Sequence, residues 1–292
     1  RDTGADLFVH PYFRRAHEFP LYFSIPGKNW LAGFGDSGGP QGSQPLMVGM
    51  FRRMELASGA QYYLQQALGA ERTEPLYLEP IQRWLFHALR LGGATAVVPD
   101  LSAAKPPAAL ARQFPSVGWV ALRSGWDAAG DLLAFRSGPS VGHSHLDQNS
   151  FIVAARGEVL ASDPGYQRFN MTYPDGRDRE LTKLENAFTR GSLGHNVILV
   201  DGEAQKKADG ALRGFFDSPN MSGATGEAAN AYSTLRQFTR HVLHVRSLGL
   251  FVVLDQIRTD GRRRAIEWLL QTQPRGRFEV KGDGMIRAVV GD

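Results

Sequence analysis

The chain has 292 residues, of which 42% are hydrophobic and 21% are charged, so we expect a sizeable packed core in one or two domains. It contains no cysteine, which excludes disulfides, thiolate metal ligands and thiol nucleophiles, and which suits a periplasmic or secreted bacterial protein. The formal net charge of +4 favours an anionic partner. The longest basic run is RRR at 262–264, and the sequence shows no nucleic-acid-binding module, no membrane helix and no signal peptide. We therefore expect neither nucleic acid nor a membrane as a partner.

Residues 1–100 have the apolar spacing of helices. One such segment, 45–69, ends at Gly69, which suits a helix C-cap. The segment 78–93 contains a second helical pattern, with Pro80 near its first turn and Gly92-Gly93 past the expected helix end. Between Pro20 and Pro45 we expect a long loop rich in glycine, proline and aromatic residues, and loops of this length are usually functional or disordered. Its aromatic residues argue against disorder.

After a Pro- and Ala-rich linker, 101–115, the apolar pattern changes from helical spacing to alternation with a period of two residues. From residue 116 onward, short β-branched and aromatic runs are separated by turns that contain glycine. The segments with this pattern are 118–125, 132–138, 149–163, 195–203, 241–261 and 265–273. Such a series is typical of an antiparallel sandwich or barrel, so we expect a β-sandwich over 116–292.

The run GHSHLD places His143, His145 and Asp147 at alternate positions. On a strand these side chains would share one face, and the simplest interpretation of that face is an exposed polar surface. Asp163 and His195, however, also lie at the ends of apolar segments and close to glycine. Imidazole and carboxylate groups suit zinc or a similar divalent ion, and three protein ligands suffice. A metallo-β-lactamase-like His-x-His-x-Asp-His pattern is a weaker alternative, since Gln148 stands where its last histidine should be.

Three motifs together resemble those of the heparinase II/III-like polysaccharide lyases. They are the Gly-His-x-His-x-Asp run and the Asp-Pro-Gly turn, both within 135–166, and the His-Asn-x-x-x-x-Asp-Gly strand within 194–205. Upstream, residues 10–27 and the GFGDSGG segment look like the last part of the family's helical toroid. The resemblance implies an α+β multidomain fold, an incomplete (α/α) toroid followed by an antiparallel β-sandwich. Residues 1–100 would then be the C-terminal part of the toroid, and 116–292 a sandwich truncated at its C-terminal end.

The resemblance also implies a chemistry: β-elimination at a uronic acid of an anionic polysaccharide, a glycosaminoglycan or alginate. By position, His143 resembles a cleft histidine that takes part in proton transfer, whereas His145, Asp163 and His195 resemble the ligands of one structural divalent ion, zinc by our prediction. Tyr173 falls where some members carry a cleft tyrosine. Further candidates for substrate binding are His10, Tyr12, Arg14, Arg15, Gln148 and Asn149. For Gln148 and Asn149, as for Asp147, an orienting role behind the metal ligands is the alternative.

The family's main base, a toroid tyrosine, and its carboxylate-neutralising Asn-His pair have no counterpart in 1–100. We expect them upstream of Arg1, which makes the chain an internal piece of a longer enzyme. Two rival functions stay open at this point. One is a metal-dependent hydrolase that uses the His-x-His-x-Asp run, and the other is a non-catalytic carbohydrate-binding sandwich with a structural metal.

Overall fold

The computed structural model describes residues 11–28, 30–36, 39–40, 58–69, 102–165, 187–272, 277–280 and 286–289. The chain divides into two compact units. The first comprises Arg1–Ser24, Lys28–Leu31 and Pro40–Ala108. The second comprises Ile25–Gly27, Ala32–Gly39 and Ala109–Asp292. The segment Ala32–Gly39, which lies early in the sequence, therefore belongs with the β-rich unit.

Helices occur in the first unit. They are α1 (Pro11–Arg15), α2 (Glu18–Phe23) and α4 (Ser58–Gly69). The short strands β1 (Trp30–Leu31) and β2 (Gly39–Pro40) follow α2. The loop predicted from Pro20 is thus partly helical, because Pro20 stands in the first turn of α2, where its missing N–H breaks no helical bond. α4 ends at Gly69 as predicted, and the helix predicted over 78–93 lies outside the described residues. No helix in the described ranges is long and apolar enough to cross a membrane.

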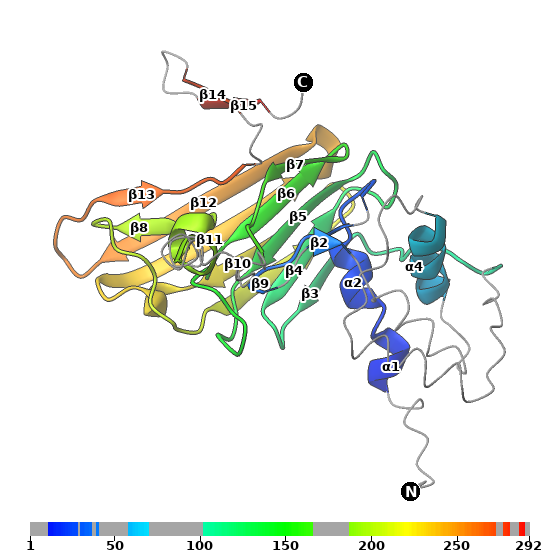
Figure 1. Cartoon of the computed structure of the whole chain (residues 1–292), viewed down its shortest axis with the longest axis horizontal. Coiled ribbons are helices and arrows are strands. Elements are labelled where there is room, and N and C mark those ends of the chain that lie inside the picture. Colours follow the sequence, from blue (N-terminus) through cyan, green and yellow to red (C-terminus); the bar gives the residue numbers. More distant parts are fainter. Residues whose placement is uncertain are drawn as a thin grey trace, which may run out of the picture. The chain divides into compact units, whose positions relative to one another are not determined.

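Five consecutive strands of the second unit form an antiparallel meander (Figure 1). They are β3 (Ala111–Phe114), β4 (Trp119–Arg123), β5 (Asp131–Arg136), β6 (Phe151–Ala155) and β7 (Glu158–Ala161). The sheet therefore begins inside the range predicted as a linker, since β3 pairs with β4. β3 is only four residues long and follows a proline-rich stretch, so its sequence carries too little alternation to reveal it.

A second antiparallel sheet has the order β12-β11-β10-β9. Its strands are β9 (Ala211–Asp217), β10 (Met221–Glu227), β11 (Leu235–Val245) and β12 (Leu250–Thr259). β9 and β10 were not predicted. In β10 the alternation is weak, because the strand is rich in small residues and carries no large apolar side chain except Met221. Two smaller sheets pair β8 (Ile198–Val200) with β13 (Ile266–Trp268), and β14 (Arg277–Val280) with β15 (Ile286–Val289). Short 3-10 turns lie at Ser192–Gly194, Ala229–Ala231 and Arg246–Leu248.

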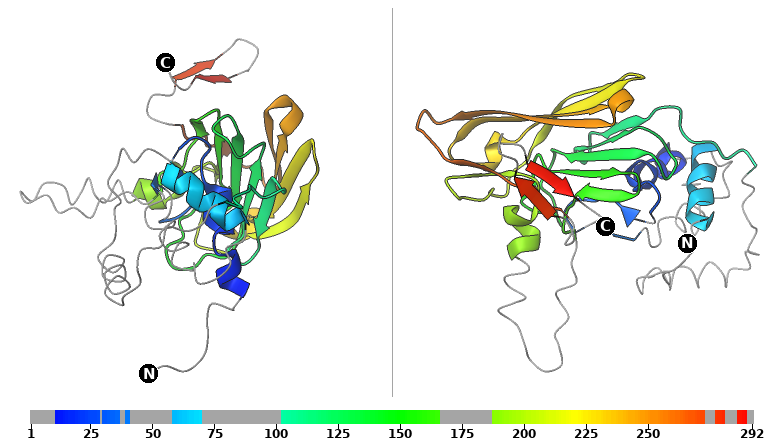
Figure 2. Two further views of the ribbon diagram at one scale, coloured as in Figure 1. Left: turned by 90° about the vertical axis from the view of Figure 1, so that its right-hand side faces the viewer. Right: turned by 90° about the horizontal axis from the view of Figure 1, so that it is seen from above.

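The two large sheets pack face to face and enclose the main core, as the view from above shows (Figure 2). Leu122, Leu133 and Phe135 of the first sheet are fully buried and join Val242 of the second in one apolar cluster. A second cluster surrounds β8 and packs it against Phe238 and Tyr232. The observed architecture is therefore an antiparallel β-sandwich with few helices. The loops that link its strands at β5–β6 and before β8 carry the residues of interest.

Candidate functional site

The His-x-His-x-Asp run lies in the loop 137–150 between β5 and β6 and is not a strand. The interpretation of the run as a strand, on which its three side chains would share one face, therefore does not hold. The side chain of His143 is 86% exposed, whereas His145 is 3% exposed and Asp147 is fully buried. The loop thus presents one histidine to solvent and turns the other inward.

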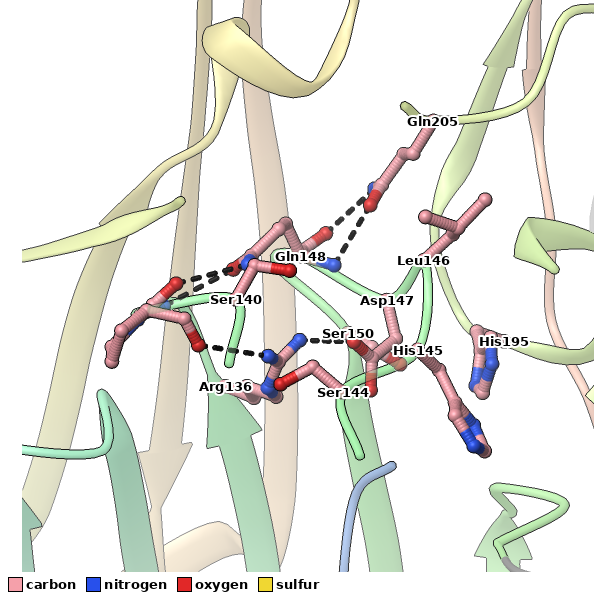
Figure 3. A network of polar contacts seen from close by, with 12 residues as sticks. Arg136, Ser140, Ser144, His145, Leu146, Asp147, Gln148, Ser150, His195 and Gln205 are labelled. Carbon is pink, nitrogen blue, oxygen red and sulfur yellow. Dashed lines mark hydrogen bonds and ion pairs between the residues drawn. The ribbon is translucent and has the colours of Figure 1, made fainter. Parts of the chain in front are cut away.

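Buried amide side chains hold this loop in shape (Figure 3). The backbone N–H of Gln148 donates to Oε1 of Gln205, and Nε2 of Gln205 donates back to the carbonyl of Gln148, at 2.8 and 2.9 Å. The Gln148 amide in turn bonds to both backbone groups of Gly138 and to the carbonyl of Ala208. In this arrangement Gln148 serves the protein's own backbone, in keeping with an orienting role rather than with the predicted contact to substrate.

Asn149 is a strained and fully buried residue of the same loop. Its φ of 61° lies in the left-handed region, which few residues other than glycine adopt. Its side-chain nitrogen donates to the carbonyls of Gly226 and Phe238, and its own carbonyl accepts from the guanidinium of Arg240. Asn149 therefore fixes the loop against β10 and β11, which again indicates a framework role rather than the predicted substrate contact. Strained residues of this kind concentrate at functional sites.

Asp147 points into the interior and is paired with Arg136 at the end of β5. Nη1 of Arg136 donates to Oδ1 of Asp147, and both side chains are buried, so the pair neutralises one charge of the site. The second carboxylate oxygen, Oδ2, is buried and has no hydrogen-bond partner among the described residues. A buried charge of this kind is costly unless a further partner, such as a cation, reaches it.

Asp163 and His195 meet beside Asp147. Asp163 follows β7, and its Oδ2 lies 2.8 Å from Nδ1 of His195, while its Oδ1 accepts the N–H of Gly165. Asn196 fixes the position of His195 by bonding to the carbonyls of Phe151 and Ser162. Burial alone would lower the pKa of His195, but the charges of Asp163 and Asp147 and the hydrogen bond to Asp163 raise that pKa above its ordinary value.

These side chains form a cluster with the properties of a cation site. One ligand atom from each of Asp147, Asp163 and His195 lies within 4.8 Å of the others. The ring of His145 lies beside that of His195, with centroids 5.3 Å apart (Figure 3). Nδ1 of His145 and Nε2 of His195 are buried and, within the described part of the chain, have no hydrogen-bond partner. Two carboxylates and two imidazoles, of which Asp147 and both histidines keep an unpaired atom, are a donor set that fits zinc.

Asp36, in the GFGDSGG segment, joins both histidines of the run. Its Oδ2 lies 2.6 Å from Nδ1 of His143, and its Oδ1 lies 2.8 Å from Nε2 of His145. Burial alone would raise the pKa of Asp36, but the hydrogen bonds with His145 and His143 and the nearby charge of Arg190 hold it below its ordinary value. Asp36 is therefore an ionised carboxylate, a hydrogen-bond acceptor shared by two imidazoles.

The remaining predicted site residues lie in the first unit or outside the described residues. Tyr12 is 65% exposed, and Arg15 forms an exposed ion pair with Glu18. The backbone of Arg14 belongs to α1. His10 and Tyr173 are among the residues that the structure does not describe. The roles predicted for these five residues stay predictions.

The sequence did not reveal Asp36 and Arg136 as residues of the site, and it predicted only an orienting role for Asp147. Asp36 lies 107 positions before His143, and no local pattern connects them. Arg136 ends an apolar strand and resembles any charged residue at a strand terminus. Asp147 was expected to orient the ligands, but its free oxygen places it among the possible ligands themselves. The alternate spacing of His145 and Asp147 was the signal that could have suggested this.

Comparison with known proteins agrees with this architecture. A family model described as Heparinase II/III-like, C-terminal, matches residues 106–289. No curated protein matches the chain. A solved structure of heparinase III has a TM-score of 0.63 at 18% identity, over 93% of this chain and 38% of that one. A heparan sulfate lyase from Pedobacter heparinus has a TM-score of 0.62, also at 18% identity, over 89% of this chain and 34% of that one.

A further heparinase III structure has a TM-score of 0.60 at 15% identity and covers 90% of this chain and 34% of that one. At such identities these similarities show the fold alone, and the chain spans well under half the length of each of the three solved proteins. The family model, by contrast, covers most of the chain and includes every strand from β3 to β15. The chain therefore belongs to the heparinase II/III-like family.

Proposed function

We propose that this chain is part of a polysaccharide lyase that cleaves a uronate-containing glycan by β-elimination. The observation that carries the proposal is the position of His143: an exposed imidazole, held by Asp36, on the loop that also carries Asp147 of the buried histidine–carboxylate cluster. Membership of the heparinase II/III-like family supports the same reaction class. Of the glycans considered, heparan sulfate is the first to test, because one structural neighbour is a heparan sulfate lyase. Other glycosaminoglycans and alginate follow.

The reaction requires a base, an acid and compensation of charge. A base removes the proton from C5 of the uronate, the electron pair forms the C4=C5 double bond, and the C4–O bond breaks. The leaving oxygen then takes up a proton. Base and acid catalysis each contribute typically about 10²–10⁴-fold, and stabilisation of the developing carboxylate charge is usually the largest effect. We place His143 in the proton transfer.

The buried cluster would hold one divalent ion, zinc by its donor set, through His145, Asp163 and His195, with Asp147 as a further donor. When bound, such an ion would supply positive charge between the buried carboxylates and tie the loop 137–150 to the segments that carry Asp163 and His195. Its role is structural in this proposal, and no step of the elimination passes through it. A glycan polymer as substrate agrees with a periplasmic or secreted location, which we also propose.

The product of the reaction gives the decisive test. The protein that carries this chain should be incubated with heparan sulfate, chondroitin sulfate, hyaluronan and alginate, and absorbance in the near ultraviolet followed. A lyase creates an unsaturated uronate that absorbs there. Cleavage without this absorbance would instead identify a hydrolase. Binding without cleavage would identify a carbohydrate-binding module, and either result would overturn the proposal.

Metal analysis tests the cluster independently of activity. The purified protein should contain one equivalent of a divalent ion, and adding zinc to metal-free protein should raise its melting temperature. Binding to the folded state alone stabilises by about 2.7 kcal/mol at a free zinc concentration 100 times the dissociation constant. The variants Asp163→Asn and His195→Gln should lose most of this zinc-dependent shift, whereas Asp131→Asn, outside the cluster, should retain it. Equal shifts in all variants would contradict the site.

A further inference from the structure

The part of the GFGDSGG segment from Phe34 to Asp36 is fixed against the His-x-His loop by its main chain and next to Trp119 by an aromatic contact. The N–H of Asp36 donates to the carbonyl of His143 at 3.0 Å. Gly35 has a φ of +66°, and a Cβ at this position would lie 2.6 Å from that same carbonyl oxygen, so only glycine permits the approach. Phe34 is 2% exposed and packs edge-on against Trp119 at 5.0 Å. These contacts therefore fix the position of the Asp36 carboxylate.

From this place the carboxylate contacts a different nitrogen on each histidine: Nδ1 of His143 and Nε2 of His145. A carboxylate can only accept hydrogen bonds. Each contacted nitrogen must therefore carry a proton, and in a neutral imidazole the other nitrogen then has the free lone pair. The two rings are thereby held in opposite tautomers by one side chain.

The free nitrogens that result face different surroundings. On His143, whose side chain is 86% exposed, Nε2 is left unprotonated. On His145 the unprotonated nitrogen is Nδ1, which is buried and has no partner among the described residues, on a ring that lies beside His195. One nitrogen is thus available to a substrate and the other to a metal ion.

We propose that Asp36 is the positioning residue of this site, which sets His143 for proton transfer through Nε2 and His145 for metal binding through Nδ1. Asp36 itself touches neither substrate nor ion. The part that concerns proton transfer rests on the proposed lyase function, while the assignment of the two tautomers does not. Carboxylates that orient metal-binding histidines commonly contribute about 10–100-fold to metal affinity.

Long-range ¹H–¹⁵N correlation spectra of the histidine rings test the proposal directly. The metal-free protein should be measured near pH 8, above the ordinary imidazole pKa of about 6.5. His143→Gln and His145→Gln identify the two sets of signals. We expect the Nδ1–H tautomer for His143 and the Nε2–H tautomer for His145. The reverse tautomer, or a doubly protonated ring, on either residue would overturn the proposal.

The variant Asp36→Asn sharpens the test. An amide offers one acceptor and one donor group, so it cannot accept from both rings, and at least one histidine should change tautomer. Zinc affinity should fall about 10–100-fold if His145 is released. The matched control is Asp131→Asn, because Asp131 also faces a buried histidine, His244, at 3.6 Å. That variant should alter the His244 signals only, and unchanged spectra in Asp36→Asn would contradict the role given to Asp36.

Activity assays distinguish a failure of the role proposed for Asp36 from a failure of the proposed lyase function. In the protein that carries this chain, Asp36→Asn should lower kcat for unsaturated product more than it raises KM, and Asp36→Glu should restore part of the loss. If the unaltered protein forms no unsaturated product from any glycan, the lyase function fails, yet the ring spectra still decide what Asp36 does. If the protein is active and Asp36→Asn retains full kcat, the positioning role in catalysis fails.

Discussion

Strand β11 and the loop 137–150 both contain residues at alternate positions whose side chains can be compared, but the two regions place them differently. In β11, Arg240, Val242 and His244 are two apart and all are fully buried on one face. In the loop, His143 and His145 are also two apart, yet one is exposed and the other buried. Alternation determines the direction of a side chain only where neighbouring strands impose an extended backbone.

The neighbours of the two regions explain the contrast. β11 is paired with β10 on one side and with β12 on the other, in long antiparallel registers. The loop instead takes its shape from side chains: the amides of Gln148 and Gln205, the left-handed Asn149, and the buried pair of Arg136 with Asp147. The loop is therefore more sensitive than β11 to the loss of single polar side chains. The following experiments test that difference, beginning with the largest expected effect.

Arg136→Met should destabilise the protein by about 3–5 kcal/mol, because it leaves the buried Asp147 without its ion partner. Denaturant unfolding measures this free energy. Arg264→Met is the control, since Arg264 pairs with Asp260 and Asp201 near the surface and its loss should matter far less. Equal losses in the two variants would mean that the loop does not depend on its buried charges.

Asn149→Ala should cost on the order of 2–3 kcal/mol, because the buried carbonyls of Gly226 and Phe238 both lose the side-chain donor that ties the loop to β10 and β11, and Phe238 keeps only the N–H of Ala228. Asn149→Gly should recover part of that loss by relieving the left-handed backbone. Arg156 has a similar φ of 52°, but it lies in the β6–β7 turn. Arg156→Ala should therefore change the unfolding free energy by less than about 0.5 kcal/mol. A negligible effect of Asn149→Ala would remove this residue from the framework.

His244 tests the sheet side of the comparison through pH. Burial, opposed by the charge of Asp131 and aided by that of Arg246, holds the pKa of His244 below its ordinary value. The unfolded chain then binds a proton more readily than the folded protein, so stability should fall as the pH drops below about 6.5. The loss should level off once the pH is below the folded-state pKa.

His244→Phe removes the titrating group and keeps an aromatic ring against Phe251, which stacks on His244 at 4.4 Å. Its stability should therefore decline less than that of the unaltered protein between about pH 7 and pH 5. Urea unfolding at a series of pH values measures the two slopes. Identical slopes would show that His244 does not contribute to the pH dependence.

The sequence predicts most of the sandwich because its signals are local. Apolar alternation identified β4, β5, the β6–β7 hairpin, β8 and the β11–β12 hairpin. It failed for β10, where small residues fill tight places: a Cβ at Gly223 would meet Leu243 and Phe216, and one at Gly226 would meet Asn149. Their place in a strand depends on contacts with distant segments that no local pattern records.

The residues of the site likewise fall into those that the sequence predicts and those that only the folded structure reveals. His145, Asp163 and His195 were predicted from their residue types and from the resemblance to the family, and the structure places Asp163 and His195 together, with the ring of His145 beside them. Asp36 could not be predicted, because only the folded chain brings it to the loop. The buried orientation of the Asp147 side chain could not be predicted either, because it depends on the pairing with Arg136 and on a loop that is not extended.

The central claim is that one short loop separates two tasks, with His143 for chemistry and His145 for the metal ion. Measuring both unsaturated product and bound zinc for His143→Ala and His145→Ala, in the protein that carries this chain, tests it most directly. We predict that His143→Ala abolishes most product formation and keeps its zinc, whereas His145→Ala loses zinc and stability together. Loss of zinc from His143→Ala, or full activity of that variant, would contradict the account.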